Sequence, residues 1–234
     1  MKRLAAALVV LLAFAAAGGA GAQQRQLRVL FVGNSLTATN DLPGTVAAIA
    51  RGVGHTTIDV QMLAPGGYAL EDHWADGAAL EALRTGRFDV VVLQQGPSSL
   101  PESRVNLIEW ARRWADEARA NGTRPAVLTV WPERERFYVF ADVVRNYRDA
   151  ARAANALLLP AGQAWRNAFR RRPAIGLYGT DAFHPSRVGT YLAALVAYAG
   201  LTGELPRTLP AAGGVKPTGR TALVLRAATA DLWR

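Results

Sequence analysis

Short apolar runs alternate with amphipathic stretches along most of the chain. The apolar runs have the length and the β-branched content of strands, and they cover residues 27–32, 57–63, 89–93, 126–130 and 156–159. Between them, apolar side chains recur every three or four residues, which predicts helices at 43–53, 76–84, 104–120 (with Ser103 as its cap), 138–154, 162–170 and 186–199. This alternation predicts an α/β fold, in which a doubly wound sheet of five parallel strands is covered by helices on both faces.

The amino terminus has the pattern of a cleaved signal peptide. Lys2 and Arg3 precede an apolar run at residues 4–17, and Ala-Gly-Ala at 20–22 resembles a cleavage site. The run is short for a membrane span, and no cysteine follows it for lipid attachment. We therefore expect residues 1–22 to be removed after Ala22, with export to the periplasm or the medium and no stable membrane anchor.

Length and composition predict that residues 23–234 form a single domain. Half of the 234 residues are hydrophobic, which is enough for one substantial core. The chain from about residue 202 onward, rich in Pro and Gly, is expected to be a wrapping tail with a candidate helix at 220–233. With no cysteine in the sequence, neither disulfides nor thiolate chemistry is available. The pattern leaves the oligomeric state open.

The net charge of +9 falls to +7 once Lys2 and Arg3 are removed with the signal peptide. Nearly all of the remaining positive charges are arginines scattered through predicted helices, and the only dense run is Arg-Arg-Arg at 170–172. This distribution favours a solvated face, or a general attraction to anionic envelope surfaces, over nucleic-acid recognition. We expect no nucleic-acid partner.

Two distant stretches carry groups suited to hydrolysis. Ser35 follows the first predicted strand directly, at the sheet edge where α/β proteins gather ligands, although Gly-Asn-Ser alone is also a common turn. Far along the chain, Asp181 and His184 stand three residues apart before the last predicted helix. Together they could supply the nucleophile, base and orienting acid of a serine hydrolase, and the topology brings them to one edge of the sheet.

These motifs resemble the blocks of the SGNH, or GDSL, hydrolase family, and the resemblance runs from the first predicted strand to the last helix. Gly-Asn-Ser-Leu at 33–36 is similar to the first block, with Asn34 where aspartate is usual and Ser35 at the nucleophile position. Gly67 is similar to the glycine of the second block, whose N–H serves the oxyanion hole, and Gly66 is an alternative. Asp181 and His184 match the last block, Asp-x-x-His.

The third block departs from the family pattern. In place of Gly-x-Asn-Asp the chain has Leu-Gln-Gln-Gly-Pro at 93–97, which looks more like the Gln-Gly-Glu variant of members that are carbohydrate acetylesterases. By that resemblance Gln95 donates its amide N–H to the oxyanion, with Gln94 as the alternative. Pro97 breaks even the variant pattern.

The resemblance implies a flavodoxin-like, three-layer α/β/α fold and an exported serine esterase that needs no metal or organic cofactor. The expected oxyanion hole combines N–H groups of Ser35, Gly67 and Gln95. The variant third block points to O-acetyl groups of a carbohydrate or envelope polymer, so the expected partner is a small or polymeric ester, such as an acetylated glycan. A lysophospholipase or thioesterase on the same fold, or a catalytically silent glycan-binding domain, are the alternatives.

Three further residues are expected at the edge of the substrate pocket. Trp74 and Trp131 fall in predicted loops at the active edge. His73 follows two acidic residues, but a zinc site would need a third ligand at suitable spacing and none is evident. We therefore interpret His73 as a structural or pocket-edge residue and predict no metal site.

Overall fold

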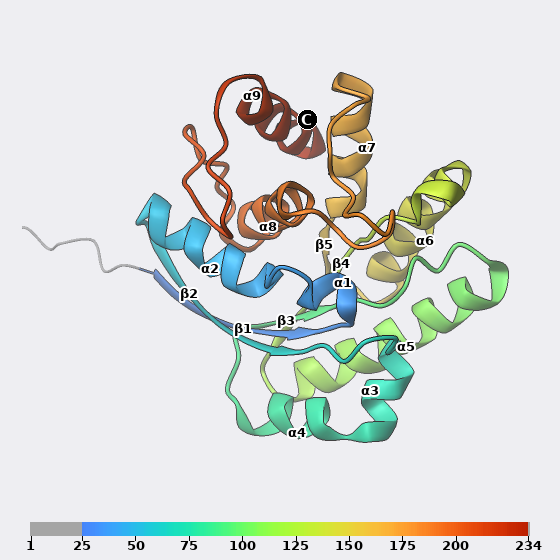
Figure 1. Ribbon diagram of the computed structural model, residues 1–234. Coiled ribbons are helices and arrows are strands. Elements are labelled where there is room, and N and C mark those ends of the chain that lie inside the picture. The colour runs from blue at the N-terminus through green and yellow to red at the C-terminus, as the bar shows by residue number, and fades with distance from the viewer. Residues whose placement is uncertain (1–24, 234) are drawn as a thin grey trace, which may run out of the picture.

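The computed structural model describes residues 25–233, and the predicted signal peptide at residues 1–22 lies outside them (Figure 1). Five parallel strands form one sheet in the order β2-β1-β3-β4-β5. They are β1 (Arg25–Val32), β2 (Thr56–Leu63), β3 (Val90–Leu93), β4 (Arg124–Leu128) and β5 (Leu157–Leu159). The order reverses direction at β1, so the predicted doubly wound sheet is confirmed, and its strands differ from the predicted ranges only at their ends.

The helices form a layer on each side of the sheet (Figure 1). Helices α2 (Leu42–Val53), α7 (Ala161–Arg171), α8 (Arg187–Thr202) and α9 (Gly219–Ala230) lie on one side. On the other side lie α3 (Leu70–Asp76), α4 (Ala78–Thr85) and α5 (Pro101–Ala120), and α6 (Phe140–Ala153) packs against α5. The remaining elements are α1 (Ser35–Ala38) and the 3₁₀ helices η1 (Arg134–Val139) and η2 (Asp231–Trp233). This is the predicted three-layer α/β/α architecture.

The centre of the core is formed by β1 and β3, which have helices over both faces. Val29, Leu30, Val90 and Val91 have no exposed surface, as the continuous apolar sequence of a central parallel strand predicts. Helix α8 is buried nearly all round, rather than along one stripe as predicted, because α2, α7 and α9 all pack against it. Part of the predicted C-terminal tail therefore belongs to the core, where α9 buries Val224, Leu225 and Ala228.

Helices α3 and α5 differ from the sequence prediction because local capping interactions set where they begin. Helix α5 begins at Pro101, a residue that needs no N–H partner, so Ser103 lies in the first turn and accepts a hydrogen bond from the N–H of Leu100 (3.1 Å) instead of acting as the N-cap. Helix α3 was not predicted at all. The Asp72 carboxylate stabilises its start by accepting from the N–H of Ala69 (2.7 Å), and Gly77, with φ of 85°, separates α3 from α4.

Across residues 25–233, no helix combines the length and apolar character needed to cross a membrane.

The close contact between α8 and the segment before it predicts a strong effect of Gly189→Ala. An added Cβ would lie 2.2 Å from the carbonyl oxygen of Leu177 and 2.6 Å from the ring of Trp165. Relieving this overlap requires backbone movement, so we expect the free energy of unfolding to fall by about 1–3 kcal/mol. Urea denaturation of the purified variant measures it.

Gly176→Ala is the matched control, because a Cβ there would meet nothing within 4 Å. Its free energy of unfolding is expected to change by less than about 1 kcal/mol. Equal losses in the two variants would contradict the close packing of α8 at Gly189.

Candidate active site

Ser35 is the first residue of α1, directly after the carboxyl end of β1. Asn34 caps this short helix, because its side-chain oxygen accepts from the N–H of Leu36 (3.1 Å). The abrupt change from strand to helix leaves the side chain of Ser35 half-buried at the edge of the sheet, on the wall of a cavity. The sequence Gly-Asn-Ser thus forms the turn that its composition predicts, and the turn presents the hydroxyl.

Gln94, at the end of the neighbouring strand β3, fixes this turn. Its Oε1 accepts from the N–H of Asn34 (3.0 Å) and from the hydroxyl of Thr37 (2.7 Å), and its Nε2 donates to Oδ1 of Asn34 (3.0 Å). Asn34 in turn donates from Nδ2 to the carbonyl of Tyr68 (2.9 Å), in the loop after β2. A glycine is required at position 33, since a Cβ there would lie 2.5 Å from Oε1 of Gln94.

Asp181 and His184 lie together in the loop between α7 and α8. Oδ1 of Asp181 accepts from the N–H groups of Phe183 (3.0 Å) and His184 (2.9 Å), which closes a tight turn. The N–H of Gly179 donates to the carbonyl of His184 (2.7 Å), and Ala182 adopts a left-handed conformation with φ of 59°. The loop is therefore held by its own hydrogen bonds.

This loop places the imidazole of His184 between a hydroxyl and a carboxylate. Nε2 of His184 lies 2.8 Å from Oγ of Ser35, although the two residues are 149 positions apart. Nδ1 lies 2.6 Å from Oδ2 of Asp181. The three residues singled out in the sequence are thus joined in one chain of hydrogen bonds.

The charge on Asp181 decides the direction of these hydrogen bonds. The hydrogen bond from the His184 side chain, helped by the N–H of Phe183, lowers the pKa of Asp181 to about 2. The carboxylate is therefore ionised near neutral pH and can only accept, so Nδ1 of His184 carries the proton. In a neutral ring Nε2 is then free to accept from the hydroxyl of Ser35.

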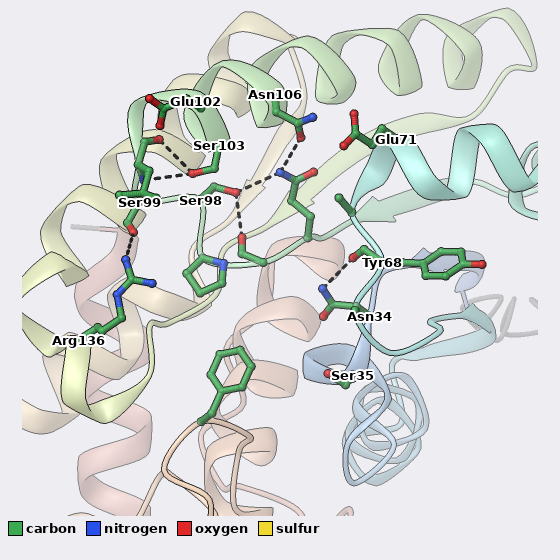
Figure 2. Close-up of a pocket in the computed structure, with 17 residues that line it drawn as sticks. Asn34, Ser35, Tyr68, Glu71, Ser98, Ser99, Glu102, Ser103, Asn106 and Arg136 are labelled. Carbon is green, nitrogen blue, oxygen red and sulfur yellow. Dashed lines mark hydrogen bonds between the residues drawn. The ribbon is translucent and has the colours of Figure 1, made fainter.

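Ser35 opens into a cavity of about 680 Å³ (Figure 2). Much of its wall is polar or charged, through the side chains of Asn34, Ser35, Glu71, Gln95, Ser98, Ser99, Glu102, Ser103, Asn106 and Arg136. Several of these residues come from the first turns of α5 and from η1. They could not be identified from the sequence, because nothing in a helical pattern tells which polar positions face a cavity formed by other loops. Among residues 25–233, no three side chains of the metal-ligating types cluster together.

Two backbone N–H groups on the cavity wall are free to bind an anion. Within the described residues, neither the N–H of Ser35 nor that of Gly67 has a hydrogen-bond partner, and both residues line the cavity. Gly66, the alternative to Gly67, does not line it. These are the positions that the family resemblance implies for the oxyanion hole.

The amides of the third block are engaged elsewhere. Gln95 lines the cavity, but its Nε2 donates to Oγ of Ser98 (3.1 Å) and to Oδ1 of Asn106 (3.2 Å). Nε2 of Gln94 donates to Asn34 and to the carbonyl of Gln95 (2.6 Å), and Gln94 is absent from the cavity wall. Each amide already uses both hydrogens, so neither offers the free N–H that was expected of an oxyanion donor.

None of the three residues expected at the pocket edge, His73, Trp74 and Trp131, lies on the wall of this cavity. His73 is buried, and its Nε2 donates to the carbonyl of Gly33 (2.6 Å). Burial lowers the pKa of His73. It therefore braces the turn that carries Ser35.

The two tryptophans pack into the protein rather than against a ligand. Trp74 meets Trp114 edge to face, with ring centroids 5.5 Å apart. Trp131 is fully buried, stacks on Trp165 with centroids 3.7 Å apart, and donates from its indole N–H to the carbonyl of Phe183 (3.1 Å). Trp74 lies on helix α3 rather than in the predicted loop, and α7 packs against Trp131 through Trp165, so both rings serve the core. Trp131 also holds the Asp181–His184 loop.

No protein-family model and no curated protein sequence matches this chain. Several solved structures are similar to it. A candidate SGNH hydrolase from Slackia heliotrinireducens is 26% identical, with a TM-score of 0.63 over 76% of this chain and 100% of that one. A DUF4886 family protein from Bacteroides uniformis is 17% identical, with a TM-score of 0.72 over 89% and 95% of the two chains.

A variant of an acetyl xylan esterase from Geobacillus stearothermophilus is also similar, with 18% identity and a TM-score of 0.61 over 78% of this chain and 97% of that one. At these lower identities the likeness shows a shared fold. The five-stranded parallel sheet of this chain agrees with that fold, which the SGNH hydrolase at 26% identity shares. The chain therefore has the fold of the SGNH, or GDSL, hydrolases and is similar in sequence to one candidate member of that family.

Proposed function

We propose that this protein is a serine esterase in which Ser35 is the nucleophile, His184 the general base and Asp181 the residue that orients the base. The observation that carries the proposal is the hydrogen-bonded chain from Oγ of Ser35 through both nitrogens of His184 to the carboxylate of Asp181. A serine hydroxyl needs such a base to attack a carbonyl at neutral pH.

In the proposed acylation step, Nε2 of His184 takes the hydroxyl proton while Oγ of Ser35 forms a bond to the ester carbonyl carbon. The carbonyl π electrons move to oxygen and give a tetrahedral oxyanion. When this collapses, the carbon–oxygen bond to the alcohol breaks, and the imidazolium returns its proton to the departing alkoxide. The alcohol leaves and the acyl group stays on Ser35.

Deacylation repeats the sequence with water as the attacking group. His184 takes a proton from water, the hydroxide adds to the acyl carbon, and collapse breaks the bond to Oγ of Ser35, which recovers its proton from the imidazolium. In both steps the ionised Asp181 stabilises the positive charge that forms on the ring. The products are a carboxylic acid and free enzyme, so the cycle needs no metal or organic cofactor.

We assign stabilisation of the oxyanion to the backbone N–H groups of Ser35 and Gly67. Fixed donors at such a position commonly supply several kcal/mol to the transition state, and these two have no competing partner among the described residues. Gln94 and Gln95 are assigned positioning roles instead, because their amide hydrogens already bind other groups.

The polar cavity supports O-acetyl groups of a carbohydrate or envelope polymer as the substrate. Hydroxyl, amide and carboxylate groups around Ser35 can bind the hydroxyls of a sugar, whereas a long acyl chain would leave them desolvated without partners. The likeness to an acetyl xylan esterase adds support. Export of the mature chain to the periplasm or the medium, proposed from its amino-terminal sequence, would bring it to such polymers.

Ser35→Ala tests the nucleophile. We expect hydrolysis of p-nitrophenyl acetate to fall by ~10³-fold or more, because neither His184 nor the oxyanion donors can replace the attacking oxygen. Ser99→Ala, which removes a hydroxyl from another part of the cavity wall, is the matched control and should keep most of its activity. Release of p-nitrophenol measures both variants.

The same assay with p-nitrophenyl decanoate separates the substrate classes. Faster turnover of the decanoate than of the acetate would replace the acetylesterase assignment by a lysophospholipase or thioesterase. No turnover of either ester by the wild-type protein would favour a silent glycan-binding domain, and equal rates in wild type and Ser35→Ala would contradict the triad.

Asp181→Asn tests the orienting acid. The amide keeps the size of the side chain but loses its charge and lets the ring adopt the wrong tautomer, so we expect kcat at pH 7 to fall on the order of 10⁴-fold. Because the pKa of Asp181 is lowered to about 2 from an ordinary 3.8, its ionised form also stabilises the fold. That contribution is present above pH 3.8 and is lost as the pH falls towards 2.

Denaturant unfolding at several pH values therefore gives a second readout. The wild type should be the more stable protein at pH 7, and its advantage over Asp181→Asn should shrink between about pH 4 and pH 2. Asp116→Asn, at an exposed position on α5, is the control and should leave kcat unchanged. A stability difference that stays constant across this range would contradict the lowered pKa.

Gln94→Ala tests the brace behind Ser35. It leaves the N–H of Asn34 and the hydroxyl of Thr37 without partners at a buried site, so we expect the free energy of unfolding to fall by about 2–4 kcal/mol. We also expect kcat to fall with little change in KM, because the position of Ser35 loosens.

Gln61→Ala, at an exposed position in β2, is the matched control for Gln94→Ala. Both variants are measured by urea unfolding and by hydrolysis of p-nitrophenyl acetate. A stability loss no larger than that of the control would refute the bracing role.

A further inference from the structure

A second cavity, of about 410 Å³, lies on the part of the surface built from η1, α7 and the segment before the Asp181–His184 loop. We call it the arginine groove. It combines three guanidinium groups with three aromatic rings, from Arg134, Arg166, Arg170, Phe137, Phe169 and Tyr178. Nothing in the proposed triad or oxyanion hole uses these side chains.

The three arginines of the groove lack the carboxylate partners that some arginines elsewhere have. Seven arginines elsewhere in the described chain pair with a carboxylate at 4 Å or less. Within residues 25–233, no side-chain ion pair or hydrogen bond is formed by Arg134, Arg166 or Arg170, and no carboxylate lines the groove. The nearby carboxylate of Glu133 is 3.6 Å from Arg136 instead.

The positive charges are held close together in spite of their repulsion. Arg166 and Arg170 are one helical turn apart on α7, and partial burial together with the neighbouring charge of Arg170 lowers the pKa of Arg166. The guanidinium of Arg134 lies over the ring of Tyr178, 5.1 Å from its centroid. An anion bound between these guanidinium groups would offset their mutual repulsion, which no carboxylate in the groove offsets.

Aromatic rings form the apolar part of the groove, and Phe137 offers the most exposed of them to a sugar. Phe169 and Tyr178 lie nearly parallel, with an interplanar angle of 22°, and Phe137 is 43% exposed. The hydroxyl of Tyr178 donates to the carbonyl of Pro132 (2.8 Å), so the phenol is held in place. Aromatic faces pack against the C–H faces of sugar rings, while guanidinium groups form paired hydrogen bonds with carboxylate or phosphate.

The groove borders the active cavity. Arg134 and Phe137 of η1 line the groove, whereas Arg136, between them, lines the active cavity and donates to Oγ of Ser99 (3.0 Å), as Figure 2 shows. The N–H of Arg134 also donates to the carbonyl of Ala182, inside the Asp181–His184 loop (2.8 Å). One short segment therefore separates the two cavities.

We propose that the arginine groove binds an anionic unit of a glycan, one bearing a carboxylate or a phosphate, next to the unit whose ester enters the active cavity. The role of the arginine groove as a substrate subsite rests on the proposed esterase function, whereas its binding of anionic glycans does not. The enzyme would thereby select acidic polymers over neutral ones.

The test compares two double variants that remove the same charge. Arg166→Gln with Arg170→Gln empties the groove of two guanidinium groups, and Arg51→Gln with Arg207→Gln removes two exposed arginines elsewhere. Binding of oligogalacturonate, of a glycerol phosphate oligomer and of a neutral xylo-oligosaccharide of equal length is measured by calorimetry. All proteins also carry Ser35→Ala, so that binding is read without turnover.

We expect the parent protein to bind at least one anionic oligomer more tightly than the neutral one. The groove variant should lose this affinity by about tenfold or more, the loss expected for one charge-assisted hydrogen bond, and the control should lose less than about threefold. Binding of the carboxylate oligomer alone, or of the phosphate oligomer alone, would support the proposal and identify the anion. Equal losses in the two double variants, or no preference for either anionic oligomer, would overturn it.

Two further measurements distinguish this proposal from the esterase proposal and from nucleic-acid binding. With Ser35 intact, both double variants should hydrolyse p-nitrophenyl acetate at the wild-type rate, because the groove does not touch the reacting atoms. If the wild type fails to hydrolyse that ester but the groove still binds acidic oligomers, the esterase proposal fails and the binding site stands. Tighter, arginine-dependent binding of a single-stranded oligonucleotide of equal charge would overturn the assignment to a glycan.

Discussion

The paired hydrogen bonds between Asn34 and Gln94 hold together the ends of two central strands. Each residue donates to the other, across the boundary between β1 and β3, and both side chains are buried. Buried amides are stable only when their donors and acceptors are all matched, and a matched pair permits only one relative position of the two chain ends. The position of Ser35 is therefore set by the sheet rather than by the flexibility of a loop.

Other contacts extend this constraint around the serine. Asn34 reaches the loop after β2 through the carbonyl of Tyr68, and His73 reaches back from α3 to the carbonyl of Gly33. Buried polar groups on three successive strand-to-helix connections thus depend on one another. Such a network rigidifies the hydroxyl, and it leaves the free N–H groups of Ser35 and Gly67 as fixed dipoles at the cavity wall.

Much of the fold could be predicted from the sequence, because apolar runs and helical spacing report directly on burial. The juxtaposition of Ser35 with Asp181 and His184 followed from the topology, which brings the carboxyl ends of parallel strands to one edge. The roles of Gln94 and Gln95 could not be predicted in the same way. Both amides suit an oxyanion hole, and only their hydrogen-bond partners in the structure distinguish a bracing residue from an oxyanion donor. Trp131 was placed wrongly for a similar reason, since its burial depends on α7, far along the chain.

The acid and the base of the proposed triad share one four-residue turn, while the nucleophile stands on a separate element. Asp181 and His184 therefore belong to one hydrogen-bonded turn, and a shift of this loop relative to the sheet would change the separation between imidazole and hydroxyl. Two contacts anchor this loop, from the Trp131 indole and from the backbone N–H of Arg134, and they therefore help to set that separation. Substitutions far from Ser35 that shift these contacts would change the rate of catalysis through that one distance.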